Sequence, residues 1–286
     1  HDGGHVMLHL DLYLQEQLQQ AVAASVLEHG AKWGTGVLMD PFTGEVLAMC
    51  SAPTFNPNEY GKASPASRTN RAITTPYEPG SVAKSIFAAA AVQAGLLRYD
   101  SRIDCENGVY HASRGGRITD HGKSYELLSL TDVIVHSSNI GMAKVGEKLG
   151  NRRLYEVSRQ FGFGADTGID LPGESPGQLR PLAKWDGYSL RRVPFGQEIS
   201  VTALQLTRAY CALVNGGELL APRLVDRIIA ADETELWRSE RRVVCRVLSP
   251  RVAARTLAVM GQGVEGGTGR EAKLTQWTSV GKTGTA

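Results

Sequence analysis

The sequence predicts a mixed α/β (α+β) fold in which an antiparallel sheet is flanked by helices and joined to a mainly helical part. Two strand-like runs, at residues 36–39 and 45–50, flank a turn-forming segment, and a long helical pattern fills the middle of the chain. The 286 residues, 42% of them apolar and 21% charged, suffice for one large core. We therefore expect a single domain whose sheet comes from residues 1–80 and 218–286, and whose helical part spans residues 81–217.

An amphipathic helix is predicted over residues 10–28. Asp11 can cap its first turn and Gly30 can end it, and its apolar residues recur at four-residue spacing: Leu14, Leu18 and Val22. Residues 40–44, which are rich in turn formers, then join the two strand-like runs. The sequence therefore predicts a β-hairpin, and a sheet on which this helix lies.

A polar loop follows over residues 53–75, and Pro79 and Gly80 then interrupt the chain before an alanine-rich helix. Ser81 therefore lies at a predicted helix N-terminus. The remaining expected elements are a mainly helical block at 127–217 interrupted at Gly150 and 162–164, strand-like runs at 219–229 and 241–247, a helix at 250–260 and a strand at 279–286.

The composition excludes several classes of function. The 31 basic and 29 acidic side chains leave a net charge of +2, so we expect no nucleic-acid partner. The longest apolar run, residues 86–97, is shorter than the roughly 20 residues that cross a bilayer. No metal-ligand spacing is present, so we expect neither a metal nor another cofactor. We interpret the cysteines as structural thiols and three histidines as loop or packing residues: Cys50, Cys105, Cys211, Cys245, His111, His121 and His136.

Ser81 and Lys84 form a Ser-x-x-Lys motif that predicts an activated nucleophile. A serine hydroxyl must give its proton to a base before it attacks, and a three-residue offset places both side chains on one helix face. Lys84 can be that base only when neutral, which burial and a second cation favour; Lys282 is the candidate cation. The same spacing recurs at Ser279, but in a strand-like run that would point the two side chains to opposite faces.

Ser137-Ser138-Asn139 interrupts otherwise core-like sequence between two helical stretches. One interpretation is catalytic: Ser137 passes a proton between Lys84 and the leaving amine, while the Asn139 amide holds Lys84 and a substrate carbonyl. The other is a helix cap, for which serine and asparagine are common residues. The tripeptide alone does not decide between them.

Lys282-Thr283-Gly284-Thr285 predicts a strand that binds an extended peptide. Gly284 lets a substrate backbone approach, Thr283 and Thr285 share a face, and with Lys282 they can bind a terminal carboxylate. The N–H groups of Ser81 and Thr285 can then form an oxyanion hole. The alternative is an exposed edge strand that a lysine protects from further pairing.

In this order, the three motifs resemble the transpeptidase domain of class B penicillin-binding proteins. Further stretches similar to that family extend along the whole chain, at residues 8–11, 39–49, 70–72, 162–164, 167–174, 196–197, 200–202 and 267–269. The resemblance implies a penicillin-recognising serine transpeptidase fold, which is also that of serine β-lactamases. The dedicated deacylating glutamate of class A β-lactamases has no convincing counterpart in this sequence.

By this resemblance Ser81 would attack the carbonyl between the two terminal D-alanines of a peptidoglycan stem peptide, and an amine of a neighbouring stem would resolve the acyl-enzyme. β-Lactam antibiotics would also acylate Ser81. The implied partners are a glycosyltransferase and division or elongation proteins, reached through segments outside this chain. The implied location is the periplasm, at the outer face of the cytoplasmic membrane, with the anchor outside this chain. A D,D-carboxypeptidase and a β-lactam-binding sensor or scaffold remain alternatives.

The family's Lys-Thr-Gly strand is followed by a β-hairpin and a C-terminal helix, whereas this sequence ends at Ala286. The resemblance therefore implies a C-terminally truncated fragment. We expect its third motif to be poorly held and its catalysis to be weak.

Overall fold

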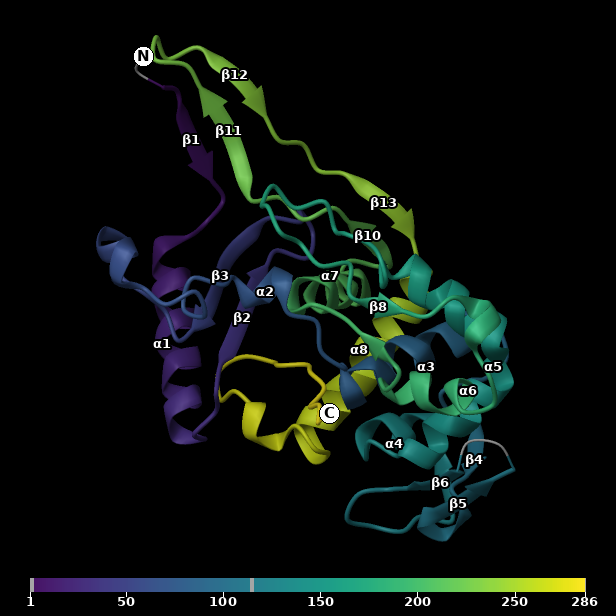
Figure 1. The fold of residues 1–286 in the computed structure, drawn as a ribbon. Coiled ribbons are helices and arrows are strands. Elements are labelled where there is room, and N and C mark those ends of the chain that lie inside the picture. Colours follow the sequence, from purple (N-terminus) through teal and green to yellow (C-terminus); the bar gives the residue numbers. More distant parts are fainter. Residues whose placement is uncertain (1–2, 114–115, 286) are drawn as a thin grey trace.

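The computed structural model, which describes residues 3–113 and 116–285, is an α/β fold from which a long β arm extends (Figure 1). The longer helices are α1 (Leu12–Glu28), α3 (Lys84–Gln93), α5 (Asn139–Gln160), α7 (Ala203–Val214) and α8 (Pro250–Gly266). The shorter helices are α2 (Arg71–Thr74), α4 (Leu130–Val135) and α6 (Ser189–Arg192). The strands form antiparallel pairs and are β1 (His5–Leu8), β2 (Gly34–Met39), β3 (Val46–Ala52), β4 (Arg102–Asp104), β5 (Val109–Ala112), β6 (Gly116–Thr119), β7 (Leu127–Ser129), β8 (Gln178–Leu179), β9 (Ile199–Ser200), β10 (Glu218–Leu220), β11 (Val225–Ile229), β12 (Glu235–Arg238) and β13 (Val243–Arg246).

The N-terminal helix α1 lies along the β2–β3 hairpin, as the sequence predicts (Figure 1). Asp11 caps the helix by accepting a hydrogen bond from the Leu14 N–H at 2.9 Å. The helix comes close to β2 because Gly36 has no side chain: a Cβ there would lie 2.8 Å from Leu18 Cδ1. The Gln15 side chain also binds both the N–H and the carbonyl of Met49 in β3. Shape and hydrogen bonds therefore fix the helix on the hairpin.

The helical part is built around α3, which is buried from Lys84 to Ala91. Helices α4, α5, α7 and α8 pack against it and share one apolar core. The predicted interruptions also occur, since Gly150 breaks the helical geometry inside α5 with φ +76° and Gly162 follows α5 with φ +85°. In the described part of the chain, no helix has the length and apolarity needed to cross a membrane.

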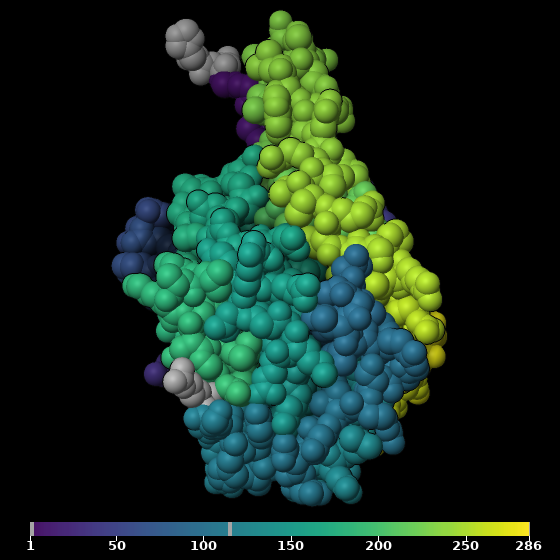
Figure 2. Space-filling view, turned by 90° about the vertical axis from the view of Figure 1, so that its right-hand side faces the viewer, coloured from purple at the N-terminus to yellow at the C-terminus, as the bar shows by residue number. Residues whose placement is uncertain are grey.

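The arm consists of β1, β11 and β12, with β11 in the centre. Figure 2 shows it as a narrow projection from a rounded body. Strands β10 and β13 form a separate pair where the arm meets the body. The sequence predicts β10, β11 and β13 from their apolar runs, but not β12, in which all four residues are exposed.

A small lobe formed by residues 101–129 was not predicted. It contains the pairs β4–β7 and β5–β6, whose strands are only three or four residues long. Such short strands carry too little alternation to be recognised from sequence. This lobe lies against α5 and thereby contributes to the site described below.

The predicted strand at 279–286 is wrong over its described part. Residues 279–285 have no regular secondary structure and pair with no strand, and Ala286 lies outside the described residues. A strand needs a neighbour that satisfies its N–H and carbonyl groups, and no described segment pairs with this one.

Candidate active site

Ser81 lies in a tight turn that leads into the buried helix α3. The turn is a 3₁₀ segment, Gly80–Ala83, so Ser81 precedes the first α-helical turn instead of belonging to it. Gly196 holds this turn from the side, because its carbonyl accepts a hydrogen bond from the Gly80 N–H at 3.1 Å. A Cβ on Gly196, where φ is +82°, would lie 2.0 Å from the Gly80 oxygen. Only glycine therefore fits beside the serine turn.

Lys84, three residues after Ser81, is fully buried. Its Nζ donates hydrogen bonds to the Ser137 carbonyl at 2.5 Å, to Ser137 Oγ at 3.1 Å and to Asn139 Oδ1 at 2.7 Å. The pKa of Lys84 falls to about 7, first because burial disfavours the ammonium and second because Lys282 is close; Asp120 acts in the opposite direction. Lys84 is therefore neutral in a large fraction of molecules near neutral pH, as a general base must be.

Ser137 and Asn139 surround the Lys84 ammonium, and Ser138 faces away from it. Ser137 has a left-handed backbone, with φ +58°, which turns both its carbonyl and its hydroxyl toward Lys84. Ser138 is buried and caps α5, since its Oγ accepts from the Gly141 N–H at 2.9 Å. The cap interpretation is therefore confirmed for Ser138, whereas Ser137 and Asn139 make the contacts with Lys84 that the catalytic interpretation requires.

Lys282 reaches the same hydroxyl from the C-terminal segment. Its Nζ donates to Ser137 Oγ and to the Thr283 carbonyl, each at 2.9 Å. Burial lowers the pKa of Lys282 to about 8. Thr283 donates in turn to Thr268 Oγ1 at 2.9 Å, in the loop after α8. Side-chain contacts thus hold the third motif at the site without a sheet.

Gly284 packs against the serine turn. A Cβ on Gly284 would lie 2.5 Å from Val82 Cγ2 and 3.2 Å from the Pro79 carbonyl oxygen. From the sequence we expected this glycine to admit a substrate backbone, whereas in the structure it lets the third motif approach the turn that carries Ser81.

The three motifs line one pocket of about 390 Å³. Its wall combines predicted site residues with others for which the sequence suggested no role: Ser81, Ser137, Asn139, Thr283 and Thr285, together with His121, His136, Phe195, Gln197 and Thr268. The N–H groups of Ser81 and Thr285 bind no acceptor among the described residues, so both can donate to a ligand. The candidate nucleophile and the candidate oxyanion donors therefore line one cavity, and Lys84 reaches its wall through Ser137 and Asn139.

Two of the histidines interpreted as loop or packing residues therefore line this pocket. His136 does pack, because its ring stacks on Tyr125 with centroids 5.3 Å apart, but it also borders the cavity. His136 directly precedes the second motif at the end of α4, whereas His121 is brought to the pocket by the small lobe. The four cysteines are free thiols, three of them buried.

In the second Ser-x-x-Lys match, the two side chains bind separate partners. Ser279 donates its hydroxyl to the Ala272 carbonyl at 2.8 Å, whereas Lys282 donates to Ser137. The expected reason for this separation, strand alternation, is wrong, because residues 279–282 form no strand.

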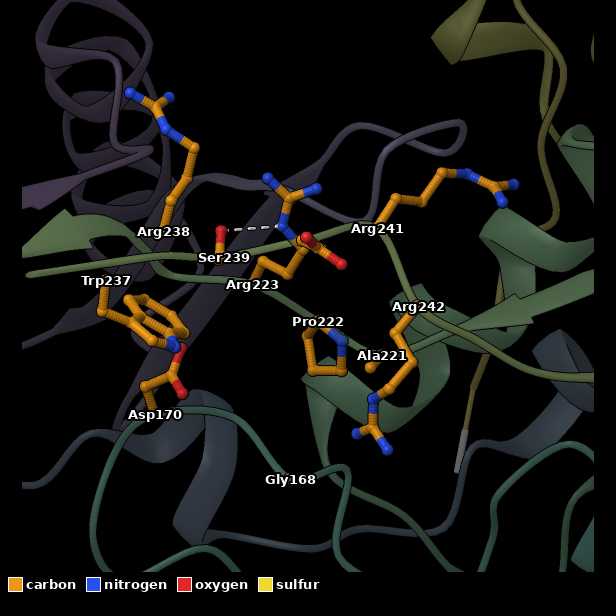
Figure 3. A pocket seen from close by; sticks show the side chains of 11 residues that line it. Gly168, Asp170, Ala221, Pro222, Arg223, Trp237, Arg238, Ser239, Arg241 and Arg242 are labelled. Carbon is orange, nitrogen blue, oxygen red and sulfur yellow. Dashed lines mark hydrogen bonds between the residues drawn. The ribbon is translucent and has the colours of Figure 1, made fainter. Parts of the chain in front are cut away.

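A larger pocket of about 520 Å³ lies at the base of the arm (Figure 3). Arginines dominate its lining, and several of them already have partners: Arg223 binds Ser239 and Arg241 binds the Phe42 carbonyl. None of its lining residues is a lysine that could serve as a base for Ser239. We therefore place the chemistry in the smaller pocket.

Residues 34–286 match the family model of the penicillin binding protein transpeptidase domain. The chain belongs to this family. More narrowly, it is the transpeptidase domain of a class B penicillin-binding protein, as the sequence resemblance implied. Its mixed fold with antiparallel sheets is that of the related solved structures.

Relatives and solved structures are similar along nearly the whole chain. Penicillin-binding protein PbpB of Mycolicibacterium smegmatis is 36% identical over 296 residues, covering 100% of this chain and 45% of that protein. The probable peptidoglycan D,D-transpeptidase PbpC of Pseudomonas aeruginosa is 33% identical over 98% of this chain and 48% of that protein. The crystal structure of penicillin binding protein 3 from Mycobacterium tuberculosis, complexed with aztreonam, superposes with a TM-score of 0.91 at 33% identity, covering 99% of this chain and 65% of that one. The chain thus spans about half the length of the curated relatives it matches.

Proposed function

We propose that this chain is a serine D,D-transpeptidase that cross-links peptidoglycan stem peptides through an acyl-enzyme on Ser81. The observation that carries the proposal is the chain of contacts from Lys84 through Ser137 to Lys282, because Ser137 lines the same pocket as Ser81. A buried lysine with a pKa of about 7 beside such a serine is suited to proton transfer near neutral pH.

In the first step, Ser81 Oγ attacks the carbonyl carbon between the two terminal D-alanines, and its proton passes to neutral Lys84. No hydrogen bond joins Ser81 Oγ to Lys84 among the described residues, so this contact forms in the substrate complex. The developing oxyanion accepts hydrogen bonds from the N–H groups of Ser81 and Thr285. The first bond thus forms on the side of the serine turn that lines the pocket.

In the second step, the tetrahedral intermediate collapses and expels D-alanine. The leaving nitrogen needs a proton, and Ser137 supplies one while Lys84, which received the Ser81 proton, restores it. Lys282 holds Ser137 from the other side and presents a cation to the substrate carboxylate with Thr283 and Thr285. An amine of a neighbouring stem then attacks the ester carbonyl and gives its proton to Lys84, which passes it to Ser81 Oγ as the ester bond breaks, so that Ser81 is released and the cross-link is formed.

The same reasoning makes β-lactams inhibitors, since their ring carbonyl reaches Ser81 and the opened ring remains attached. In support, related structures are described as complexes with aztreonam and with ampicillin. We further propose action outside the cytoplasm, at the periplasmic face of the cytoplasmic membrane, together with a glycosyltransferase and division or elongation proteins bound by other segments. Neither a cofactor nor a nucleic acid takes part in this scheme.

The first test is intact-mass analysis after long incubation with penicillin. We expect one adduct on the wild-type chain and none on Ser81→Ala or Lys84→Met. An adduct that persists in Ser81→Ala would overturn the assignment of the nucleophile, and a wild-type chain that is never acylated would overturn the proposal as a whole.

The second test separates transpeptidase from its alternatives. Lipid-linked disaccharide pentapeptide is supplied, and the products are resolved by chromatography. Cross-linked dimers that disappear in Ser81→Ala support the proposal. Release of D-alanine without dimers would instead show a carboxypeptidase, and acylation by penicillin with neither product would show a sensor or scaffold.

A further inference from the structure

Asp120, which directly follows β6, binds the segment that carries the second motif. Its Oδ2 accepts from Ser138 Oγ at 2.8 Å, and its Oδ1 accepts from the N–H groups of Asn139 at 2.6 Å and Ile140 at 3.0 Å. One carboxylate thus satisfies two of the N–H groups that the first turn of α5 leaves unpaired and one side-chain hydroxyl.

The preceding residue fixes the Asn139 side chain. Asn139 Nδ2 donates to the Thr119 carbonyl at 3.0 Å, so the amide oxygen must face the other way, where it accepts from Lys84 at 2.7 Å. The Thr119 carbonyl can only accept, so the amide nitrogen must face it, and this is the single amide orientation that serves both neighbours. The second Nδ2 hydrogen remains available for a substrate carbonyl.

We propose that Asp120 is a positioning residue for the reaction: its carboxylate holds the first turn of α5 so that Ser137 and Asn139 present their oxygens to Lys84. The inference rests on the proposed function and extends it, because it assigns a catalytic purpose to the lobe that the sequence did not predict. The residue that follows β6 thus holds the second motif in place through its hydrogen bonds.

A carboxylate is better suited to this position than a neutral acceptor. Ser138 Oγ already accepts from the Gly141 N–H, so its own proton must go to an acceptor, and the two backbone N–H groups require another. An asparagine at position 120 would have one oxygen for these three donors, and its NH₂ group would face an N–H or O–H group. We therefore expect substitution by asparagine to displace the turn.

Asp120 also acts on Lys84 through its charge. The charged groups that act on Lys84 are Lys282 from the C-terminal segment, which lowers its pKa, and Asp120 from the end of β6, which raises it. The imidazoles of His121 and His136 line the same pocket. Removing the Asp120 charge should lower the pKa of Lys84 further. The acid limb of acylation, which is the low-pH part of the profile where the rate falls as Lys84 becomes protonated, should therefore move to lower pH.

The test measures acylation by a fluorescent penicillin as a function of pH, with folding followed by circular dichroism. We expect Asp120→Asn to acylate about 10- to 100-fold more slowly at the plateau, with an acid limb shifted to lower pH. The matched control is Glu106→Gln, which removes a carboxylate that binds Lys144 on the same helix at 2.7 Å without touching the motif. This control should keep the wild-type rate and limb.

A second variant separates geometry from charge and covers the case in which Asp120→Asn does not fold. Ser138→Ala removes one donor to Asp120 and the acceptor of the Gly141 N–H but leaves the Asp120 carboxylate, so we expect slower acylation with an unmoved acid limb. Plateau rates within twofold of wild type in folded Asp120→Asn or in Ser138→Ala, or an equal loss in Glu106→Gln, would overturn the inference. Slower acylation of Asp120→Asn with its acid limb at the wild-type pH would overturn the inference as well. Because wild type is acylated in each of these cases, the proposed function itself would stand.

Discussion

Lys282 should control the pH at which Ser81 becomes reactive. Its ammonium shares the Ser137 hydroxyl with that of Lys84, so each cation makes the other harder to protonate. Replacing Lys282 with methionine (K282M) removes the charge while keeping a side chain of similar length. Since a positive neighbour lowers the pKa of Lys84, its removal must raise that pKa, and the acid limb of acylation must move to higher pH.

The structure sets the size of this shift. Both Nζ atoms hydrogen-bond to Ser137 Oγ, at 3.1 and 2.9 Å, so they lie no more than about 6 Å apart. At an effective dielectric constant of about 20 to 40, the repulsion is about 1.5 to 3 kcal/mol, or about 1 to 2 pKa units. A shift of about 1.5 units from a pKa of about 7 leaves about 3% of Lys84 neutral at pH 7, instead of about half. Acylation at that pH should therefore slow by about 15-fold.

The assay is the rate of acylation by a fluorescent penicillin, measured from weakly acidic to alkaline pH. K282M also loses a cation that binds the ligand carboxylate, which lowers the whole profile, so the diagnostic quantity is the position of the acid limb and not its height. The control K282R keeps a positive charge and should keep the wild-type limb. If K282M has its acid limb at the wild-type pH or below it, the two lysines are not electrostatically coupled, and burial alone must account for the lowered pKa of Lys84.

Three further results are expected. The pKa of Lys84 is lowered from 10.5 to about 7 on folding, so between these pH values the unfolded state binds a proton that the folded state does not, and stability must rise with pH. Relative to Lys84→Met, the melting temperature of the wild-type chain should rise by about 3 °C per pH unit across that window. Equal slopes of melting temperature against pH in the two proteins would refute the burial argument. Gly284→Ala should slow acylation because its Cβ meets Val82 Cγ2, and adding Val82→Ala should restore part of the rate, whereas additive losses would contradict the packing explanation. Gly196→Ala should abolish acylation and lower the melting temperature, because the neighbour it meets is the rigid Gly80 backbone; an active variant would show that the turn can move.

The sequence predicted those parts of the fold in which the signal is local. Helix α1 shows a four-residue apolar period with a cap at Asp11, and the hairpin shows two short runs around a turn-rich segment. The lowered pKa of Lys84 was also within reach, because a buried Ser-x-x-Lys helix and a second lysine supply both causes. In each case, the prediction needed only residues close in sequence or the repulsion between two lysine charges.

The parts that could not be predicted depend on contacts between distant segments. Asp120 is an ordinary polar loop residue in the sequence, and Thr268 is noticed there only as part of a stretch that resembles the family; only the fold brings them to Asn139 and Thr283. The predicted strand at 279–286 failed for the opposite reason, since alternating residues allow a strand but pairing creates one. Local sequence patterns thus identify the candidate reacting residues more easily than the residues that hold them in place.

The second motif shows why a structural and a catalytic interpretation need not compete. Ser138 caps α5, and that cap is what fixes the backbone on either side of it. Ser137, one residue before, is then held with a left-handed backbone, and Asn139, one residue after, opens the helix with its amide oxygen toward Lys84. A helix start is a rigid place to mount two side chains that must meet a third within hydrogen-bonding distance. The capping tendency that made the tripeptide look ordinary is therefore part of how it positions the lysine.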